Sequence, residues 1–423
     1  MLPALLGSFA VLLVLRVPVA AAMGLSGAFA VLTSDMGLPL AVVPQRIFVL
    51  LDSTSLLAIP FFILAGAIME QGGMARRMID FAQTMVGHWR GGLAQVDVLA
   101  STIFSSLTGS SAASASATGS ILIPAMKREG YPAGYAAALE ASSAAIGPII
   151  PPSIIMVIYG SLAGVSVGAL FLSGIVPGLM ITLGLFAVNA VMARRRAWGG
   201  GPRATFGERA KAARLAGAAL VAPLIIIGGI LGGVFTPTEA GAVAVVYAAV
   251  VSLLVYREMG PGRLLAVVLD AALTTGIIGL IIASAGIFGW VLAFEQVPQT
   301  VVTWVQSVTG DPTVAILLVI GFVLALGCVV DVTAAVIILV PVFAPLGASY
   351  GYDPVHFGII MCLALVYGNV TPPVGLLLFL TASIAKCSVG EVMRYQLPFY
   401  LVLSLVLAAT VALPGAVLFL ARL

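Results

Sequence analysis

Long stretches of this chain carry no charged side chain. No Lys, Arg, Asp or Glu occurs within 98–126, 141–193, 215–238, 312–330 or 354–385. A helix needs about 20 apolar residues to cross a bilayer, and these stretches are long enough. Charged residues make up only 8% of the 423 residues, whereas a soluble domain carries about 25%. A soluble enzyme, a nucleic-acid-binding protein and a disordered protein are therefore excluded, and we expect an all-α polytopic protein surrounded by membrane lipid.

The basic residues predict which side of the membrane each loop occupies. The segment 194–214 holds seven of them against one acid, and such clusters remain in the cytoplasm. Counting crossings outward from this loop places Arg77, Arg90 and Lys127 on the cytoplasmic side as well. The segment 93–126 lies between Arg90 and Lys127, so it must enter and leave the membrane by the same face. We therefore predict a re-entrant helical hairpin over 93–126.

The composition of this hairpin agrees with its predicted course. Its middle reads Leu-Thr-Gly-Ser-Ser-Ala-Ala-Ser over 107–114. A non-helical turn at membrane depth is tolerated only inside the protein or beside a wet cavity. A second hairpin is predicted over 313–348, with its turn near 327–333, because the acids that flank it both fall on the outer side.

The N-terminal third allows two arrangements. In the first, short helices at 2–15 and 18–34 hinge at Pro18, and 47–69 then crosses toward the cytoplasm. In the second, one long tilted helix replaces the short pair and reverses the N-terminus. The segment 75–88 is amphipathic and is predicted to lie in the membrane interface.

The chain contains an internal repeat. Gly130-Tyr131 is followed 21 residues later by Pro151-Pro152, and Gly351-Tyr352 is followed 21 residues later by Pro372-Pro373. Several such matches in one order indicate a duplication. The topology places an odd number of crossings between the halves, so the two repeats enter the membrane from opposite faces. Inverted repeats are typical of secondary transporters, whose binding sites lie near the midplane at the repeat interface.

The first hairpin can also be aligned with the second. We match Pro124 with Pro341, which requires a four-residue insertion between the repeats. This alignment pairs Ser114 with Asp331. The repeats and loops together divide the chain into N-terminal scaffold helices and an interfacial helix (1–92), a first transport part (93–193), a basic cytoplasmic loop (194–215), a second scaffold part (216–310), a second transport part (311–396) and a C-terminal helix (397–423).

Each repeat also contains a predicted broken helix, over 134–160 and 354–385. The breaks are Gly147–Pro152 and Gly368–Pro373, and proline frees backbone carbonyl oxygens from the helical pattern. A free polar group in lipid costs several kcal/mol unless something binds it. Sodium accepts such oxygens, and the N-terminal dipole of the half-helix after each break suits a carboxylate. Prolines that merely kink packed helices are the alternative.

These features predict two sets of site residues. The expected sodium ligands lie in the hairpin turns and helix breaks: Gly109, Ser110, Ser111, Ser114, Gly147, Pro148, Asp331, Thr333, Gly368, Asn369 and Thr371. The expected substrate contacts are Ser110, Ser111, Pro151, Pro152, Pro372 and Pro373. No other metal and no organic cofactor is expected, because the histidines and cysteines form no ligand motif.

Acidic residues inside apolar segments need a separate explanation. Asp331 stands alone inside the second hairpin, and an ionised Asp at membrane depth costs at least about 2.5 kcal/mol. It either binds sodium or caps the helix 332–348. Asp52, Glu140 and Asp270 are candidates either for lining a transport path or for structural roles.

Several strings of this chain resemble a known family. They are Ser120–Tyr131, Gly147–Tyr159, Phe235–Ala240, Asp353–Gly358 and Thr371–Gly375. The chain resembles, over nearly its whole length, the large membrane subunit of tripartite ATP-independent periplasmic (TRAP) transporters. The resemblance implies an inverted-repeat fold of the ion-transporter superfamily type, with two re-entrant hairpins and two broken helices, in the bacterial inner membrane.

The same resemblance implies a function and partners. It implies sodium-driven import of organic acids, C4-dicarboxylates among them, by an elevator mechanism. It also implies a periplasmic substrate-binding protein and a small four-helix membrane subunit, which we expect as a separate chain because no such segment precedes Met1. Many family members carry Asp where this chain has Ser114, so a first sodium site here would depend on neutral oxygens.

Two other transport functions and one enzymatic function were weighed against this one. A self-sufficient sodium–dicarboxylate or anion carrier on a related plan needs no periplasmic partner. A channel also uses re-entrant hairpins, but paired helix breaks suit moving gates better. An intramembrane enzyme is not expected, because the sequence suggests no Ser–His, paired-Asp or metal-ligand arrangement at membrane depth.

Overall fold

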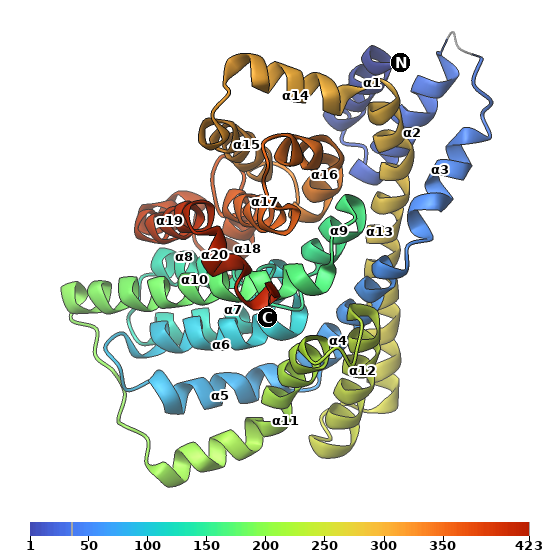
Figure 1. Cartoon of the computed structure of the whole chain (residues 1–423). Helices are drawn as coiled ribbons and strands as arrows, with labels where there is room; N and C mark the ends of the chain where they lie inside the picture. The colour runs from blue at the N-terminus through green and yellow to red at the C-terminus, as the bar shows by residue number, and fades with distance from the viewer. Residues whose placement is uncertain (35–36, 423) are drawn as a thin grey trace.

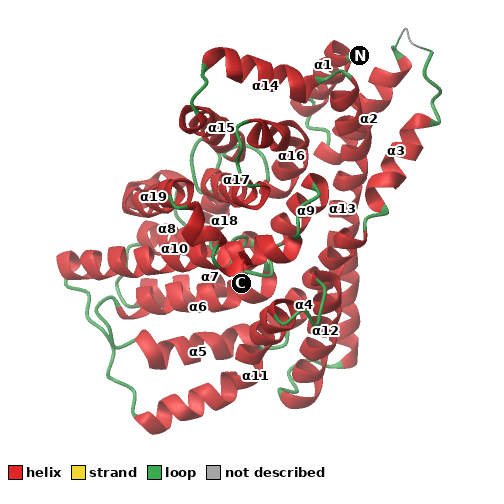
Figure 2. Ribbon diagram, in the orientation of Figure 1, coloured by secondary structure: helices red, strands yellow, loops and turns green. Residues whose placement is uncertain are grey.

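The computed structural model describes residues 1–34 and 37–422, and within these ranges the chain is helical with no strand (Figures 1 and 2). In the described ranges, seven helical stretches are long and apolar enough to cross a membrane: Thr54–Gln71, Val167–Arg196, Phe206–Leu231, Pro237–Val255, Pro261–Phe294, Val332–Ser349 and Val389–Ala412. Apolar helices of 10–17 residues lie between them. The chain is therefore a polytopic all-α protein, as its charge pattern predicts.

The N-terminal part begins with the predicted pair of short helices. Its elements are α1 (Leu2–Val14), α2 (Val19–Leu32), α3 (Val42–Leu51), η1 (Thr54–Leu57) and α4 (Ala58–Gln71). The amino group of Met1 lies 3.1 Å from the Glu295 carboxylate, so the N-terminus shares the side on which the sequence places Glu295. The expected crossing over 47–69 corresponds to the apolar stretch Thr54–Gln71, which starts later because the chain is interrupted at Asp52 and Ser53 between α3 and η1.

The first repeat contains the predicted hairpin and broken helix. Its elements are the amphipathic α5 (Met74–Val86), the hairpin arms α6 (Gly92–Thr108) and α7 (Ser111–Arg128), the half-helices α8 (Ala133–Ala144) and α9 (Ile154–Ala163), and the long α10 (Val167–Arg196). The hairpin arms pack against each other. The hairpin turn and the helix break therefore lie where the serine-rich and proline-rich strings predict them.

The second repeat runs through the same order of elements. The helices that lead into it are α11 (Phe206–Leu231), α12 (Pro237–Val250), η2 (Val251–Val255) and α13 (Pro261–Phe294). The repeat itself consists of α14 (Val297–Val308), the hairpin arms α15 (Pro312–Gly327) and α16 (Val332–Ser349), the two parts of the broken helix, α17 (Pro354–Asn369) and α18 (Leu376–Ala385), and the long α19 (Val389–Ala412). The described chain ends with α20 (Pro414–Leu418) and η3 (Leu420–Arg422). The helix α14 was not expected from the sequence. It follows α13 as α5 follows α4, and so completes the correspondence.

The helix bounds correct the expected alignment of the two hairpins. The arms α7 and α16 each have 18 residues, and their N-cap residues are Ser110 and Asp331, 221 positions apart. The same spacing pairs Pro124 with Pro345, which also lies inside α16. The insertion inferred from Pro341 is therefore unnecessary, and the structural counterpart of Asp331 is Ser110 rather than Ser114.

The two repeats exchange their half-helices. The second half of the first broken helix, α9, packs against the hairpin arm α16 of the other repeat, and α18 packs against α7 and α8 in return. The long helices α10 and α19 also pack together. Outside this unit, α13 packs against α2, α3 and α4, and α4 packs against α12 (Figure 1). This arrangement brings the tips of both hairpins into one region beside α4 and α13.

The basic segment between the repeats is more helical than expected. The last turn of α10 already contains Arg194 and Arg196, and α11 begins at Phe206, so the irregular loop is confined to 197–205. A capping box explains the early start of α11, because the Thr205 hydroxyl accepts the Glu208 N–H and the Glu208 carboxylate accepts the Thr205 N–H. Basic side chains therefore project from two helix ends as well as from the loop.

Candidate functional site

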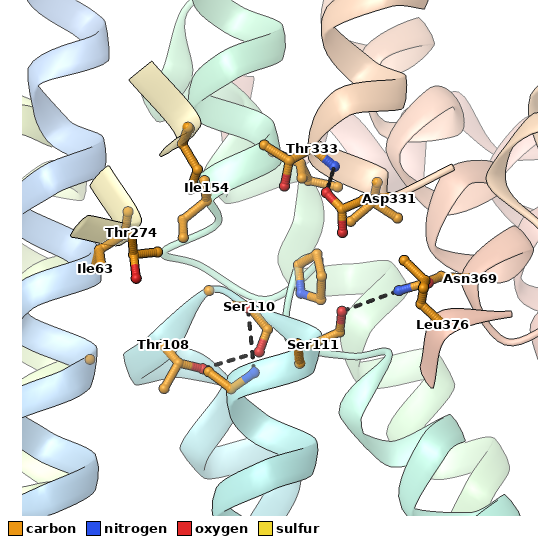
Figure 3. A pocket seen from close by; sticks show the side chains of 18 of the residues that line it. Ile63, Thr108, Ser110, Ser111, Ile154, Thr274, Asp331, Thr333, Asn369 and Leu376 are labelled. Carbon is orange, nitrogen blue, oxygen red and sulfur yellow. Dashed lines mark hydrogen bonds between the residues drawn. The ribbon is translucent and has the colours of Figure 1, made fainter. Parts of the chain in front are cut away.

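A cavity of about 460 Å³ lies between the hairpin tips, the helix breaks and the α4–α13 wall (Figure 3). Its size is within the range typical of small-molecule sites. The first repeat contributes its hairpin tip at 108–113, Pro148, Ile154 and Ile155, and the second contributes 331–333, Asn369 and part of α18. The cavity is therefore shared by both repeats, as expected for an inverted-repeat carrier.

Four helices start at this cavity in the described chain: the second arms of the two hairpins and the second halves of the two broken helices. The first helical residues of α7, α9, α16 and α18 all line it, and these are Ser111, Ile154, Val332 and Leu376. Each helix N-terminus carries a partial positive charge and backbone N–H groups without helical partners. The sequence predicts this for the two half-helices after the helix breaks. The structure adds the second arm of each hairpin.

The tip of the first hairpin is seated on the first helix break. Gly109 ends α6 in the left-handed region with φ of +61°. A Cβ atom there would overlap the Pro152 carbonyl oxygen and lie 3.1 Å from its carbonyl carbon. On the other side of the contact, a Cβ on Gly147 would lie 3.2 Å from the Ser110 carbonyl. These glycines permit the backbones of hairpin and break to approach closely.

The tip of the second hairpin contacts its own helix break in the same way. The Gly375 N–H donates a hydrogen bond of 2.9 Å to the Cys328 carbonyl. A Cβ on Gly368 would lie 2.8 Å from the backbone of Gly327. Asp331 follows this turn, and its carboxylate accepts the Thr333 N–H at 2.9 Å as the N-cap of α16. Since Asp331 also lines the cavity, it is placed both to cap the helix and to face a ligand.

A hydrogen bond between the side chains of Asn369 and Ser111 links the two halves of the site. The Asn369 amide donates to the Ser111 hydroxyl at 3.4 Å (Figure 3). Asn369 ends α17, and Ser111 begins α7 in the other repeat. The carbonyl oxygen of the Asn369 side chain is buried and has no hydrogen-bond partner within the described ranges. An acceptor in this state is available to a cation in the cavity.

The structure places some of the predicted site residues on the cavity wall and others behind it. Those on the wall are Gly109, Ser110, Ser111, Pro148, Asp331, Thr333 and Asn369. Those that do not line it are Ser114, Gly147, Gly368, Thr371, Pro151, Pro152, Pro372 and Pro373. The prolines shape the breaks, but the residues that begin the following half-helices reach the cavity.

The positions behind the wall have local partners. Ser114 is fully buried and shares a hydrogen bond of 3.0 Å with the Thr108 hydroxyl. The Thr371 hydroxyl donates to the Tyr367 carbonyl one helical turn earlier. Of the acids considered for a path, Asp52 and Asp270 are exposed elsewhere and Glu140 is fully buried, and none of them lines the cavity. The path-lining alternative for these three acids is wrong for this cavity.

Sequence reasoning missed the wall opposite the hairpins. Helix α4 contributes Ile63, Gly66, Ala67 and Glu70, and α13 contributes Thr274 and Ile278 (Figure 3). Glu70 and Asp331 are both acidic, and no Lys, Arg or His is among the described residues that line the cavity. These wall residues could not be predicted, because the sequence of an apolar helix does not show which of its faces lines a cavity. One sequence signal does mark this end of α4, because Glu70-Gln71 recurs as Glu295-Gln296 after α13.

Residues 6–416 match the family described as the DctM component of tripartite ATP-independent periplasmic transporters. The chain belongs to this family. The C4-dicarboxylate TRAP transporter large permease protein DctM of Pseudomonas aeruginosa is 42% identical over 93% of this chain and 92% of its own length. The sialic acid TRAP transporter large permease protein SiaM of Vibrio cholerae is 35% identical over 94% of this chain and 92% of its own length.

A solved structure shares the fold of this permease. The YdaH transporter of Alcanivorax borkumensis superimposes with a TM-score of 0.68 over 98% of both chains, at 14% sequence identity. The DctM-family chain is thus the large permease component of a tripartite transporter and a multi-pass protein of the inner membrane. Membership in this family implies two further components, a periplasmic binding protein and a small membrane subunit.

Proposed function

We propose that this permease imports a small organic acid by sodium symport, through an elevator movement of the hairpin-bearing unit. One observation carries the proposal. The N-termini of four described helices converge on a single cavity. The charged side chains that line this cavity, Glu70 and Asp331, are both acidic. Such a cavity offers an anion main-chain dipoles and hydroxyl groups but no basic side chain among the described residues. To a cation it offers carboxylate and amide oxygens.

The anion side of the proposal depends on the helix starts. A helix N-terminus stabilises a nearby anion by about 0.3–1 kcal/mol, and by up to about 2 kcal/mol when partly buried. The Ser110 and Ser111 hydroxyls lie at one of these starts, that of α7, and can donate to a carboxylate. The two cited relatives are named for a C4-dicarboxylate and for sialic acid. Both are carboxylates, so we propose a carboxylate as the common feature of the substrate.

The cation side depends on oxygens that the protein leaves unpaired. A carboxylate entering a cavity that already holds two acidic side chains meets repulsion on the order of 1–4 kcal/mol per close pair. Sodium ions that bind before the substrate would neutralise the two acidic side chains and so remove this repulsion. We propose one sodium site at the first hairpin turn and break, around Ser110 and Pro148. A second site would use Asp331, Thr333 and the free carbonyl oxygen of Asn369.

The elevator movement is proposed from the composition of the cavity wall. The hairpins and breaks hold each other through main-chain contacts, whereas the facing helices α4 and α13 present mostly apolar side chains such as Ile63, Ala67 and Ile278. A wall that is mostly apolar makes few hydrogen bonds to the unit that faces it and therefore suits a sliding contact. The small membrane subunit, with four helices, would brace the scaffold, and the periplasmic binding protein would deliver the substrate.

The test is uptake into liposomes that contain the permease and its two partner components. We expect uptake of a labelled organic acid only with an inward sodium gradient. Asp331→Asn keeps an N-cap residue and should raise the sodium concentration for half-maximal uptake about tenfold. Ser110→Ala, at the equivalent cap of the first hairpin, has no charge to lose and should have a smaller effect on that concentration.

Three outcomes would contradict the proposal. Uptake that does not respond to the sodium gradient would remove sodium as the coupling ion. Uptake by the permease alone, with the same rate as the three-component system, would favour a self-sufficient carrier. Uptake that fails to saturate with substrate would instead indicate a channel.

A further inference from the structure

Two carboxyl groups face each other in the interior of the first repeat, away from the cavity. Asp97 lies on α6 and Glu140 on α8, and both side chains are fully buried. Their carboxyl groups are within hydrogen-bonding reach of each other. The sequence does not predict this pair of acids, because 43 positions separate Asp97 from Glu140. The structure corrects the expectation of no paired-acid arrangement at membrane depth.

The pair has too few hydrogen-bond donors. The Thr118 hydroxyl donates to one oxygen of Glu140 at 2.7 Å. Within residues 1–34 and 37–422, the other oxygen of Glu140 and both oxygens of Asp97 have no partner. The Ser143 hydroxyl beside Asp97 is also buried and unpaired. Neither acid takes part in any salt bridge of the described chain. Three carboxyl oxygens therefore have no cation in the described chain, and the Ser143 hydroxyl is the donor that lies beside Asp97.

Two ionised carboxylates do not remain in contact in such a place. Burial without a cation penalises each charge, and a second like charge at contact penalises it again. Two carboxyl oxygens within hydrogen-bonding reach require a hydrogen atom between them, because both are acceptors when ionised. Among the described residues, no group of three or more His, Cys, Asp or Glu side chains could hold a metal ion here. One bound proton lowers the buried charge of the pair from two to one. It also supplies a donor between the two facing carboxyl oxygens.

We infer that Asp97 and Glu140 form a proton-binding site that holds one proton between them at neutral pH. The proton comes from the solvent and is taken up without any other change in bonding. Besides the two acids, the titratable group that faces the pair is the Tyr135 phenol, whose hydroxyl donates to Asn189 at 2.7 Å. No charged side chain from the helices packed around α6 and α8 acts on the pair among the described residues.

The location of this site suggests what the proton stabilises. Helix α6 is the first arm of the first hairpin, α8 is the first half of the broken helix, and Thr118 lies on the second hairpin arm α7. The shared proton thus joins the hairpin to the half-helix that leads into the break. Holding these elements together keeps the tip at Gly109 seated on Pro152 without burying two unpaired negative charges.

Infrared spectroscopy of the purified full-length chain tests this inference without any transport measurement. An un-ionised carboxylic acid has a carbonyl band distinct from those of a carboxylate and an amide. We expect this band at neutral pH in the wild type. Glu140→Gln should remove it, because the amide of Gln donates to Asp97 and leaves that carboxylate ionised. Asp97→Asn should remove it for the same reason. Asp270→Asn, which changes an exposed acid on α13, should leave the band intact.

A second variant keeps the test decisive if the amide variants fail to fold. Thr118→Val retains both acids but removes the hydroxyl that donates to Glu140. It should shift the frequency of the acid band rather than abolish it. A wild type without the band, or a band that persists unchanged in both amide variants, would overturn the inference. Loss of the band in the Asp270→Asn control would overturn it as well, because the proton would then reside elsewhere.

Discussion

Replacing Gly109 by alanine tests whether the first hairpin must sit directly on the helix break. Gly109 has φ of +61°, where an added Cβ costs about 1–2 kcal/mol. The Cβ would also overlap the Pro152 carbonyl oxygen and lie 3.1 Å from its carbonyl carbon. Carbon atoms pack best at about 3.5–4.0 Å, so the hairpin tip or the break must move by several tenths of an ångström or more. Such overpacking costs about 1–3 kcal/mol in addition.

A matched glycine separates the two costs. Gly130 has φ of +86°, and a Cβ added there meets nothing within 4 Å. Gly130→Ala should therefore show the backbone cost alone, whereas Gly109→Ala should show both. The extra 1–3 kcal/mol corresponds to a fall of about 5–150-fold in the fraction of molecules with a seated tip. We expect uptake by Gly109→Ala to fall by at least about fivefold relative to Gly130→Ala.

The measurement is initial uptake in liposomes, with thermal melting of the purified variants as the measure of folding. Gly109→Ala should melt below Gly130→Ala and transport less. If both variants have the same melting temperature and the same uptake rate, close contact between Gly109 and Pro152 does not contribute to the stability of the seated hairpin tip. The reasoning that places the hairpin tip and break in one rigid unit would then fail.

Three other changes test separate parts of the structure. Asn369→Ala removes the weak hydrogen bond to Ser111 and the unpaired side-chain oxygen. We expect a near-normal melting temperature but sodium activation weakened about tenfold, since hydrogen bonds to charged groups are worth about 1.5–3 kcal/mol. Unchanged sodium activation would exclude Asn369 as a ligand. Replacing Pro151-Pro152 by Ala-Ala should let the helix close across the break and abolish uptake, which full transport would refute. Thr236→Ala removes the capping box of α12 and should lower the unfolding free energy by about 1 kcal/mol without changing sodium dependence, so a changed sodium dependence would argue against a purely structural role.

The charge distribution of the cavity gives the sodium proposal a physical basis that the resemblance alone lacks. The residues lining the site include Glu70 and Asp331 but no basic side chain in the described chain. An anion therefore cannot be held by direct ion pairing with the protein. It depends on helix dipoles and on cations that bind beside it, so the order and number of bound sodium ions become the quantities to measure.

Some features of this site were predictable because they are local. Proline pairs break a helix wherever they stand, so the breaks before Ile154 and Leu376 follow from the sequence. A run of serines around a glycine at membrane depth indicates a turn inside protein, which is where Gly109 lies. Asp331 caps its helix through the Thr333 N–H, as a residue of its type does at the start of a helix.

Repeat matching worked for the broken helices but not for the hairpins. The double prolines are rare enough to align without ambiguity. Single prolines are not, and Pro341 and Pro345 lie in the same helix. The choice of Pro341 required an insertion and paired Asp331 with Ser114. Only the helix starts at Ser111 and Val332 show that Ser110 is the equivalent residue.

By itself, the sequence determined where this chain turns, breaks and crosses the membrane, because charge, proline and glycine act within a few residues of their own position. Which surfaces meet was decided by the tertiary structure alone. Glu70 faces the hairpins across the cavity, and Asp97 faces Glu140 across a helix contact. Such pairings depend on how each helix rotates about its axis and which neighbour it packs against. In a chain whose helices are apolar on every side, the polar pattern does not specify that rotation.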